Sequence, residues 1–110
     1  MCRVFEVEVT TQAQEQAHAI GWHVANTLCA PMAANRLVDK LEAAILSLSS
    51  NPERIPLTPE EPWHSRGIHK MVTGKYIIYF LILDEISTVR VTAVVYGRRD
   101  QKRQLEEMGI

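Results

Sequence analysis

The chain has 110 residues, of which 46% are hydrophobic and 23% are charged, and its formal net charge is −1. This length and composition predict one globular domain, residues 1–110, whose core needs no cross-links. The near-neutral charge argues against a protein that coats nucleic acid, because such proteins usually carry a surplus of Lys and Arg. Any basic contact surface must therefore be local.

The N-terminal residues contain no apolar run typical of a signal peptide, and no stretch reaches the roughly 18 apolar residues of a membrane span. Cys2 and Cys29 are far apart and have no metal-binding spacing. We interpret them as free thiols in a reducing compartment. We therefore expect a cytoplasmic protein without membrane contact.

The first predicted elements are a strand and a helix. Val4–Val9 alternates between apolar and acidic residues, which predicts a half-buried strand. Thr11 followed by Gln14 matches a capping box, in which the two side chains satisfy free N–H groups at a helix start. Apolar residues then recur every three or four positions, so we expect this helix to continue to about Leu28.

Pro31 suits the first turn of a second helix, where its missing N–H costs nothing. A nearly continuous apolar stripe follows, and the Ser-Ser-Asn-Pro sequence at 49–52 ends the helix. Because the link between the two helices is short, we expect an antiparallel hairpin. Pro52–His64 contains four prolines and is predicted to be a stiff loop anchored by Trp63.

Three strands are predicted after Gly67, at residues 68–72, 76–83 and 89–96, with turns at 73–75 and 84–87. The middle strand is apolar on both faces and should be central. In the last strand, one face should carry Val89, Val91, Ala93 and Val95. A short charged helix is expected at residues 99–108.

The predicted element order is β-α-α-β-β-β. It indicates an α+β domain in which a helical hairpin packs on one antiparallel sheet, followed by a short C-terminal helix.

A basic cluster follows the last strand. Arg98 and Arg99 come directly after Gly97, with Lys102 and Arg103 close behind. Planar guanidinium groups at a sheet edge suit phosphate or carboxylate ligands. The alternative is a solvated helix in which Arg103 pairs with a glutamate at 106 or 107.

A second basic group surrounds the first hairpin and contains Arg66, His69, Lys70 and Lys75. His69 should share a face of its strand with Met71, and Lys70 should lie on the other face. The alternative interpretation is an edge strand that its charges protect from aggregation.

Two tyrosines, Tyr79 and Tyr96, could expose hydroxyl groups beside the arginines, although core or edge packing is the more common role of strand aromatics. His18 and His23 are five positions apart, not the three or four that place two ligands on one helix face. The chain also has no nucleophile elbow, phosphate loop or dinucleotide fingerprint. We expect no metal and no cofactor.

Four stretches together resemble the RelE/ParE superfamily of type II toxin–antitoxin toxins, also described as plasmid stabilisation proteins, and its ParE branch in particular. They are APMAANRLVDKLEAAILSL with the following NPERIP, the hairpin GIHKMVTGKYIIYFLI, and the closing RVTAVVYGRRDQKRQL. The resemblance covers nearly the whole chain in the expected order. It implies a growth-inhibiting toxin that a cognate antitoxin neutralises by wrapping around it. For the oligomeric state, both a homodimer and a heterotetramer with the antitoxin stay open.

The resemblance leaves the target open, because some members cleave mRNA on the ribosome whereas ParE-like members inhibit DNA gyrase. Arg99 matches the arginine that the RNA-cleaving members carry after the last strand, and Lys70 matches a lysine of their first hairpin. Their central-strand arginine corresponds to Tyr76, and their C-terminal tyrosine corresponds to about Leu105. His69 would be needed as a base in a different arrangement.

Because two of the catalytic positions of the RNA-cleaving members are not matched, gyrase inhibition by binding is favoured over RNA cleavage. Whether the chain is an enzyme stays undecided. If it is a ribonuclease, the catalytic candidates are Arg99, Lys70 and His69. The candidate contacts for target or antitoxin are Arg66, Tyr79, Tyr96, Arg98, Arg99, Lys102 and Arg103. A protein-interaction module without toxicity is a further alternative.

Overall fold

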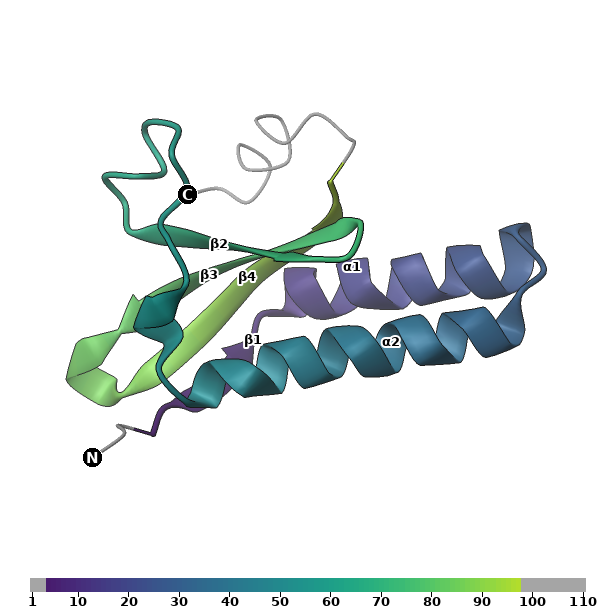
Figure 1. The fold of residues 1–110 in the computed structure, drawn as a ribbon, viewed down its shortest axis with the longest axis horizontal. Coiled ribbons are helices and arrows are strands. Elements are labelled where there is room, and N and C mark those ends of the chain that lie inside the picture. Colours follow the sequence, from purple (N-terminus) through teal and green to yellow (C-terminus); the bar gives the residue numbers. More distant parts are fainter. Residues whose placement is uncertain (1–3, 98–110) are drawn as a thin grey trace.

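The computed structural model describes residues 4–97, in which two helices lie on one face of a sheet and a long loop covers the other face (Figure 1). The helices run antiparallel, and none is long and apolar enough to cross a membrane within these residues. The elements are β1 (Glu6–Val9), α1 (Thr11–Trp22), a π-helical turn (His23–Thr27), α2 (Pro31–Leu46), β2 (Ile68–Thr73), β3 (Tyr76–Leu83) and β4 (Thr88–Tyr96). The predicted α+β class and element order are confirmed. The helix predicted at 99–108 lies outside the described residues.

The sheet is mixed, with the strand order β1-β4-β3-β2. Strands β2, β3 and β4 form antiparallel hairpins, as predicted. The expectation of a wholly antiparallel sheet is wrong for β1, which pairs parallel with β4. The physical reason is the connection: parallel neighbours need a long crossover, and here both helices and two further strands separate β1 from β4.

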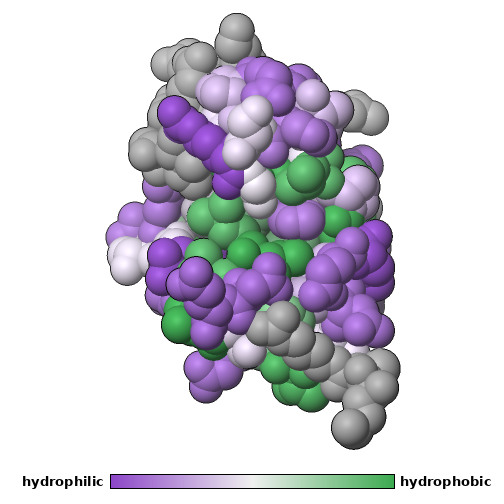
Figure 2. All heavy atoms as spheres, turned by 90° about the vertical axis from the view of Figure 1, so that its left-hand side faces the viewer, coloured by the Kyte–Doolittle hydropathy of each residue, from purple (hydrophilic) through white to green (hydrophobic). Residues whose placement is uncertain are grey.

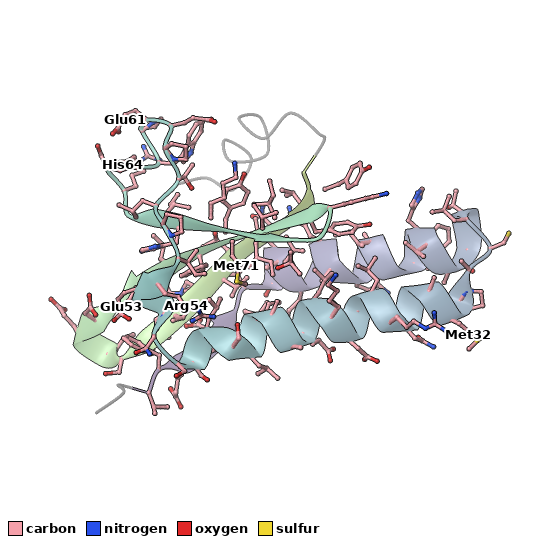
Figure 3. All side chains as sticks on the ribbon, viewed as in Figure 1. Met32, Glu53, Arg54, Glu61, His64 and Met71 are labelled. Carbon is pink, nitrogen blue, oxygen red and sulfur yellow. The ribbon has the colours of Figure 1, made fainter. Side chains whose placement is uncertain are left out.

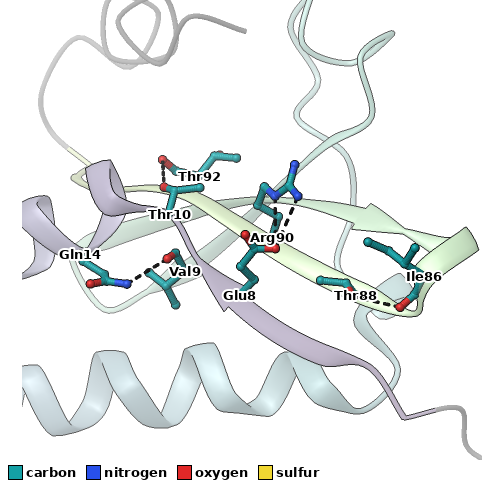
Figure 4. Close-up of polar contacts among 8 residues, drawn as sticks. All are labelled: Glu8, Val9, Thr10, Gln14, Ile86, Thr88, Arg90 and Thr92. Carbon is teal, nitrogen blue, oxygen red and sulfur yellow. Dashed lines mark hydrogen bonds and ion pairs between the residues drawn. The ribbon is translucent and has the colours of Figure 1, made fainter.

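Helix α1 begins one residue earlier than the capping-box pattern predicts. The N-cap is Thr10, whose Oγ1 accepts a hydrogen bond from the Ala13 N–H at 3.2 Å. The Gln14 amide donates to the Val9 carbonyl at 3.0 Å instead of closing a box with Thr11 (Figure 4). The same Thr10 hydroxyl also donates to the Thr92 carbonyl on β4 at 3.3 Å. Thr10 therefore ties the start of α1 to the sheet.

The variant Thr10→Ala is expected to lower the free energy of unfolding by about 1–2 kcal/mol, because it removes an N-cap and the bond to β4. Thr11→Ala is the matched control, since Thr11 is exposed in the first turn of α1. Urea unfolding followed by circular dichroism measures both. Equal losses in the two variants would contradict the assignment of the cap to Thr10.

The sheet separates two hydrophobic cores. The helix-side core joins strand residues such as Met71, Ile78 and Phe80 to Leu41 and Ile45 of α2. Figure 3 shows Met71 pointing from β2 toward the helices. The loop-side core consists of Trp63, Ile68, Ile77, Tyr79, Ala93 and Val95. Both faces of β3 are therefore covered, which confirms that it is a central strand.

A β-bulge in β4 overturns the simple alternation expected for this strand. Tyr79 pairs with Ala93 and Phe80 pairs with Val91, so Thr92 is an extra residue without a partner in the register. Its hydroxyl donates to the Tyr79 carbonyl at 3.2 Å. Because an extra residue reverses the side-chain alternation beyond it, Val89 and Val91 lie in the helix-side core while Ala93 and Val95 lie in the loop-side core.

The loop between α2 and β2 is held firmly, as its prolines predict. The Thr58 N–H donates to the Ile68 carbonyl at 2.7 Å, and the Lys70 N–H donates to the Pro56 carbonyl at 3.1 Å. The loop thus lies along part of the outer edge of β2, and Trp63 anchors it with 2% of its surface exposed. At the end of the molecule that carries this loop and the β3–β4 turn, hydrophilic side chains surround an apolar centre (Figure 2).

Candidate functional site

A groove lies between α1 and the ends of β3 and β4, with a volume of about 650 Å³. We call it the tyrosine groove, because Tyr76 and Tyr96 line it. Its apolar wall comes from Ile20, Val24 and Leu28 on the helical side and from Val94 on β4. Lys75 and His23 also line the groove, and among the described residues it contains no carboxylate. It is therefore apolar with a basic margin.

Tyr76 and Tyr96 are the last residue pair of β3 and β4. Their ring centroids are 5.6 Å apart and their planes are tilted by 53°, a geometry that favours aromatic pairs. Burial, with a smaller effect of Tyr96, raises the pKa of Tyr76 above its ordinary value. The Tyr76 phenol is consequently a neutral donor at pH 7. The bulge at Thr92 makes this pairing, because it turns Tyr96 to the helical side.

The structure does not bring the ribonuclease candidates His69 and Lys70 together. The His69 ring stacks on Phe80 at 5.0 Å on the helical side, and its Nδ1 donates to the Ile55 carbonyl at 2.8 Å. Lys70 pairs with Tyr79 on the loop side of the sheet. Phe80 and Tyr76 are four residues apart on β3, about 13 Å along the strand. The His69 ring therefore clamps the loop rather than lining the groove.

Tyr79 has the core packing that is the more common role of strand aromatics, because its side chain is fully buried in the loop-side core. The alternative, an exposed hydroxyl that contacts a partner, is wrong for this residue. Burial, with a smaller effect of Glu60, raises the pKa of Tyr79 to about 12. The proline loop with Trp63 covers this residue, and the sequence pattern of β3 alone does not reveal that cover. Tyr96 remains half-buried in the groove.

The raised pKa of Tyr79 predicts a loss of stability at alkaline pH. The buried Tyr79 phenol makes its full contribution to the free energy of unfolding below pH 10, where it is neutral in both the folded and the unfolded chain. Above pH 10 the unfolded chain releases this proton first, so the free energy of unfolding falls by about 1.4 kcal/mol per pH unit up to about pH 12. Urea unfolding at pH 9 to 12 measures the slope. A Tyr79→Phe variant with the same slope as the wild type would contradict this assignment.

The remaining contact candidates divide into two sets. Arg66 is exposed on the proline loop, where its backbone N–H donates to the carbonyls of Pro62 and Trp63. Arg98, Arg99, Lys102 and Arg103 lie outside the described residues. Within residues 4–97, no group of three or more His, Cys, Asp or Glu side chains could hold a metal ion.

Sequence reasoning missed one basic residue near the groove. A Cβ atom placed on Gly74 would lie 3.5 Å from the Lys40 Nζ, so the side chain of Lys40 reaches from α2 to the β2–β3 turn. The helical pattern places Lys40 off the apolar stripe but does not indicate what it approaches. This proximity depends on how α2 packs against the sheet.

Solved structures from toxin–antitoxin systems share this fold. A chain of the chromosomal ParDE system from P. aeruginosa has a TM-score of 0.70 and 15% identity, covering 86% of this chain and 97% of that one. The RelBE2 toxin–antitoxin complex from Mycobacterium tuberculosis has a TM-score of 0.61 and 24% identity, and the match covers 84% of this chain and 91% of that one. A double mutant of the E. coli toxin RelE in the free state has a TM-score of 0.60 and 14% identity, and the match covers 92% of each chain. The fold is that of the RelE and ParE toxins.

The model of the ParE toxin of the type II toxin–antitoxin system parDE matches residues 7–101. This match spans every helix and strand described above except Glu6, the first residue of β1. The chain therefore belongs to the ParE toxin family and is a type II toxin of the RelE/ParE superfamily. No curated protein shows a significant match to its sequence.

Proposed function

We propose that this toxin arrests growth by binding DNA gyrase, without cleaving RNA. The observation that carries the proposal is the separation of the ribonuclease candidates. His69 is engaged with Phe80 and the Ile55 carbonyl, and Lys70 lies on the opposite face of the sheet. Tyr76, which the resemblance places where the RNA-cleaving members carry a central-strand arginine, packs instead against Tyr96. Phosphodiester cleavage needs a base and cationic groups around one phosphate.

An antitoxin is the second partner in this proposal. The ParDE and RelBE2 structures are described as a toxin–antitoxin system and a toxin–antitoxin complex. We place the antitoxin segment in the tyrosine groove, since an amphipathic helix or strand would cover its apolar wall and an acidic residue would face Lys75. Both partners and the toxin would meet in the cytoplasm.

The test combines two assays on purified toxin. We expect it to block supercoiling by gyrase and to leave mRNA intact in a translating extract. Mapped mRNA ends that show codon-phased cuts, with supercoiling unaffected, would establish the ribonuclease alternative instead. In that case Arg99→Ala should abolish toxicity, and its stability should stay within about 0.5 kcal/mol of the wild type if Arg99 is exposed.

A growth assay distinguishes a toxin of either mechanism from a protein-interaction module without toxicity. Inducing the gene alone should arrest growth, and inducing it with the neighbouring antitoxin gene should restore growth. The variants His69→Ala and Lys70→Ala are expected to arrest growth like the wild type, provided that they stay folded. Absence of arrest with the wild-type chain would leave the interaction module as the remaining alternative.

A further inference from the structure

The end of the molecule that carries the β2–β3 turn collects cationic side chains from separate elements. Lys40 of α2 reaches this turn, since its Nζ would lie 3.5 Å from a Cβ on Gly74. Lys75 follows Gly74 directly, and both lysines are exposed. His23 of the π-helical turn shares the lining of the tyrosine groove with Lys75. We call Lys40 and Lys75 the turn lysines.

Neither turn lysine has a carboxylate partner within residues 4–97, whereas Arg90 pairs with Glu8. The tyrosine groove beside them is likewise free of described acidic residues. Two unpaired ammonium groups beside one tight turn repel each other, so the site favours an anion. In a chain with a net charge of −1, this is a local concentration of positive charge.

The backbone links this end to the most basic stretch of the sequence. The Gly97 N–H donates to the Lys75 carbonyl at 2.8 Å. Arg98 and Arg99 follow Gly97 directly in the sequence.

We propose that the turn lysines contact the phosphate backbone of the duplex DNA that gyrase holds. This inference rests on the proposed function, because it places the toxin on the complex of gyrase and DNA. The ligand class follows from the chemistry of the site. Each lysine ammonium is a compact point charge that can bind one phosphate oxygen, and a duplex presents a row of phosphates to lysines on separate elements. A pair of contacts on an exposed turn gives weak binding without sequence preference, which the gyrase complex would reinforce.

The experiment measures binding of the purified toxin to a fluorescein-labelled 40-base-pair duplex by anisotropy, from 50 to 200 mM salt. Each phosphate contact contributes about 0.9 to the slope of log K against log salt, so Lys40→Ala with Lys75→Ala should make that slope shallower by about 1.8. Arg90→Ala is the control, since it removes one positive charge from a residue that is already paired with Glu8. It should change neither the slope nor the affinity at 200 mM salt by more than about twofold.

A supercoiling assay runs in parallel, and there we expect the double lysine variant to need about tenfold more protein for inhibition than the wild type. A salt slope identical to that of Arg90→Ala would overturn the inference, as would binding to single-stranded RNA but not to duplex DNA. Weaker antitoxin binding with an unchanged slope would also overturn it, because the lysines would then serve the antitoxin alone. If the wild type fails to inhibit gyrase but the slope changes as expected, the proposed target is wrong while the phosphate contact stands.

Discussion

Replacing Trp63 by alanine is expected to lower the free energy of unfolding by about 3–5 kcal/mol, the largest effect of any single change considered. Trp63 is 2% exposed and packs with Tyr79 and Ile68 in the loop-side core. In the described part of the chain its indole Nε1 has no hydrogen-bond partner. The loss therefore comes from buried ring area and from release of the proline loop. Urea unfolding monitored at 222 nm measures it.

Trp22→Ala is the matched control, because Trp22 is 60% exposed at the end of α1. We expect its stability to stay within about 0.5 kcal/mol of the wild type. If Trp63→Ala does not fold, Trp63→Phe retains a ring and should show a smaller loss. Similar losses in Trp22→Ala and Trp63→Ala would contradict the role of the loop as the cover of the second core.

The second large effect concerns antitoxin binding. Tyr76→Ala is expected to weaken the complex by about 30-fold or more, because a half-buried tyrosine at the centre of a contact is a typical hot spot. Tyr76 lines the tyrosine groove and packs against Tyr96. Its removal would take away the wall of the groove on which an apolar antitoxin residue rests. Calorimetric titration of the purified toxin with its antitoxin measures the change.

Two variants test where the antitoxin lies. Tyr76→Phe keeps the ring and should bind within a few fold of the wild type. Ile86→Ala removes an apolar side chain that is 62% exposed on the β3–β4 turn, at the far end of the sheet from Tyr76. It should bind like the wild type. If Ile86→Ala weakens the complex and Tyr76→Ala does not, the antitoxin occupies that end of the molecule instead of the groove.

Local sequence signals predict most of the secondary structure. The apolar run Tyr76–Leu83 coincides with β3, and Pro31 begins α2. Both are governed by short-range chemistry: an apolar run indicates a strand covered on both faces, and proline fits the first helical turn. The anchoring of the loop by Trp63 was predictable because a large aromatic residue in a polar loop needs an apolar surface.

Features that depend on distant partners could not be predicted. The parallel pairing of β1 with β4 follows from the path of the whole chain. The bulge at Thr92 is stabilised by Thr10 and by the Tyr79 carbonyl, both remote in the sequence. This bulge moves Tyr96 to the helical side and thereby creates the tyrosine groove.

The candidate site was predictable only in part for the same reason. Sequence reasoning found the basic character of the first hairpin and singled out Tyr96. It placed His69 and Lys70 on opposite faces of their strand, as observed, but it could not find which neighbours each side chain meets, or that Lys40 reaches Gly74. These relations support the proposed mechanism.

We propose that this toxin acts on gyrase by binding. The most direct measurement is ATP-dependent supercoiling of relaxed plasmid DNA by gyrase, with increasing amounts of purified toxin and then with its antitoxin added. We expect the toxin to stop supercoiling in proportion to its concentration, and we expect an equimolar amount of antitoxin to restore it. Full supercoiling at a large molar excess of folded toxin would contradict the claim.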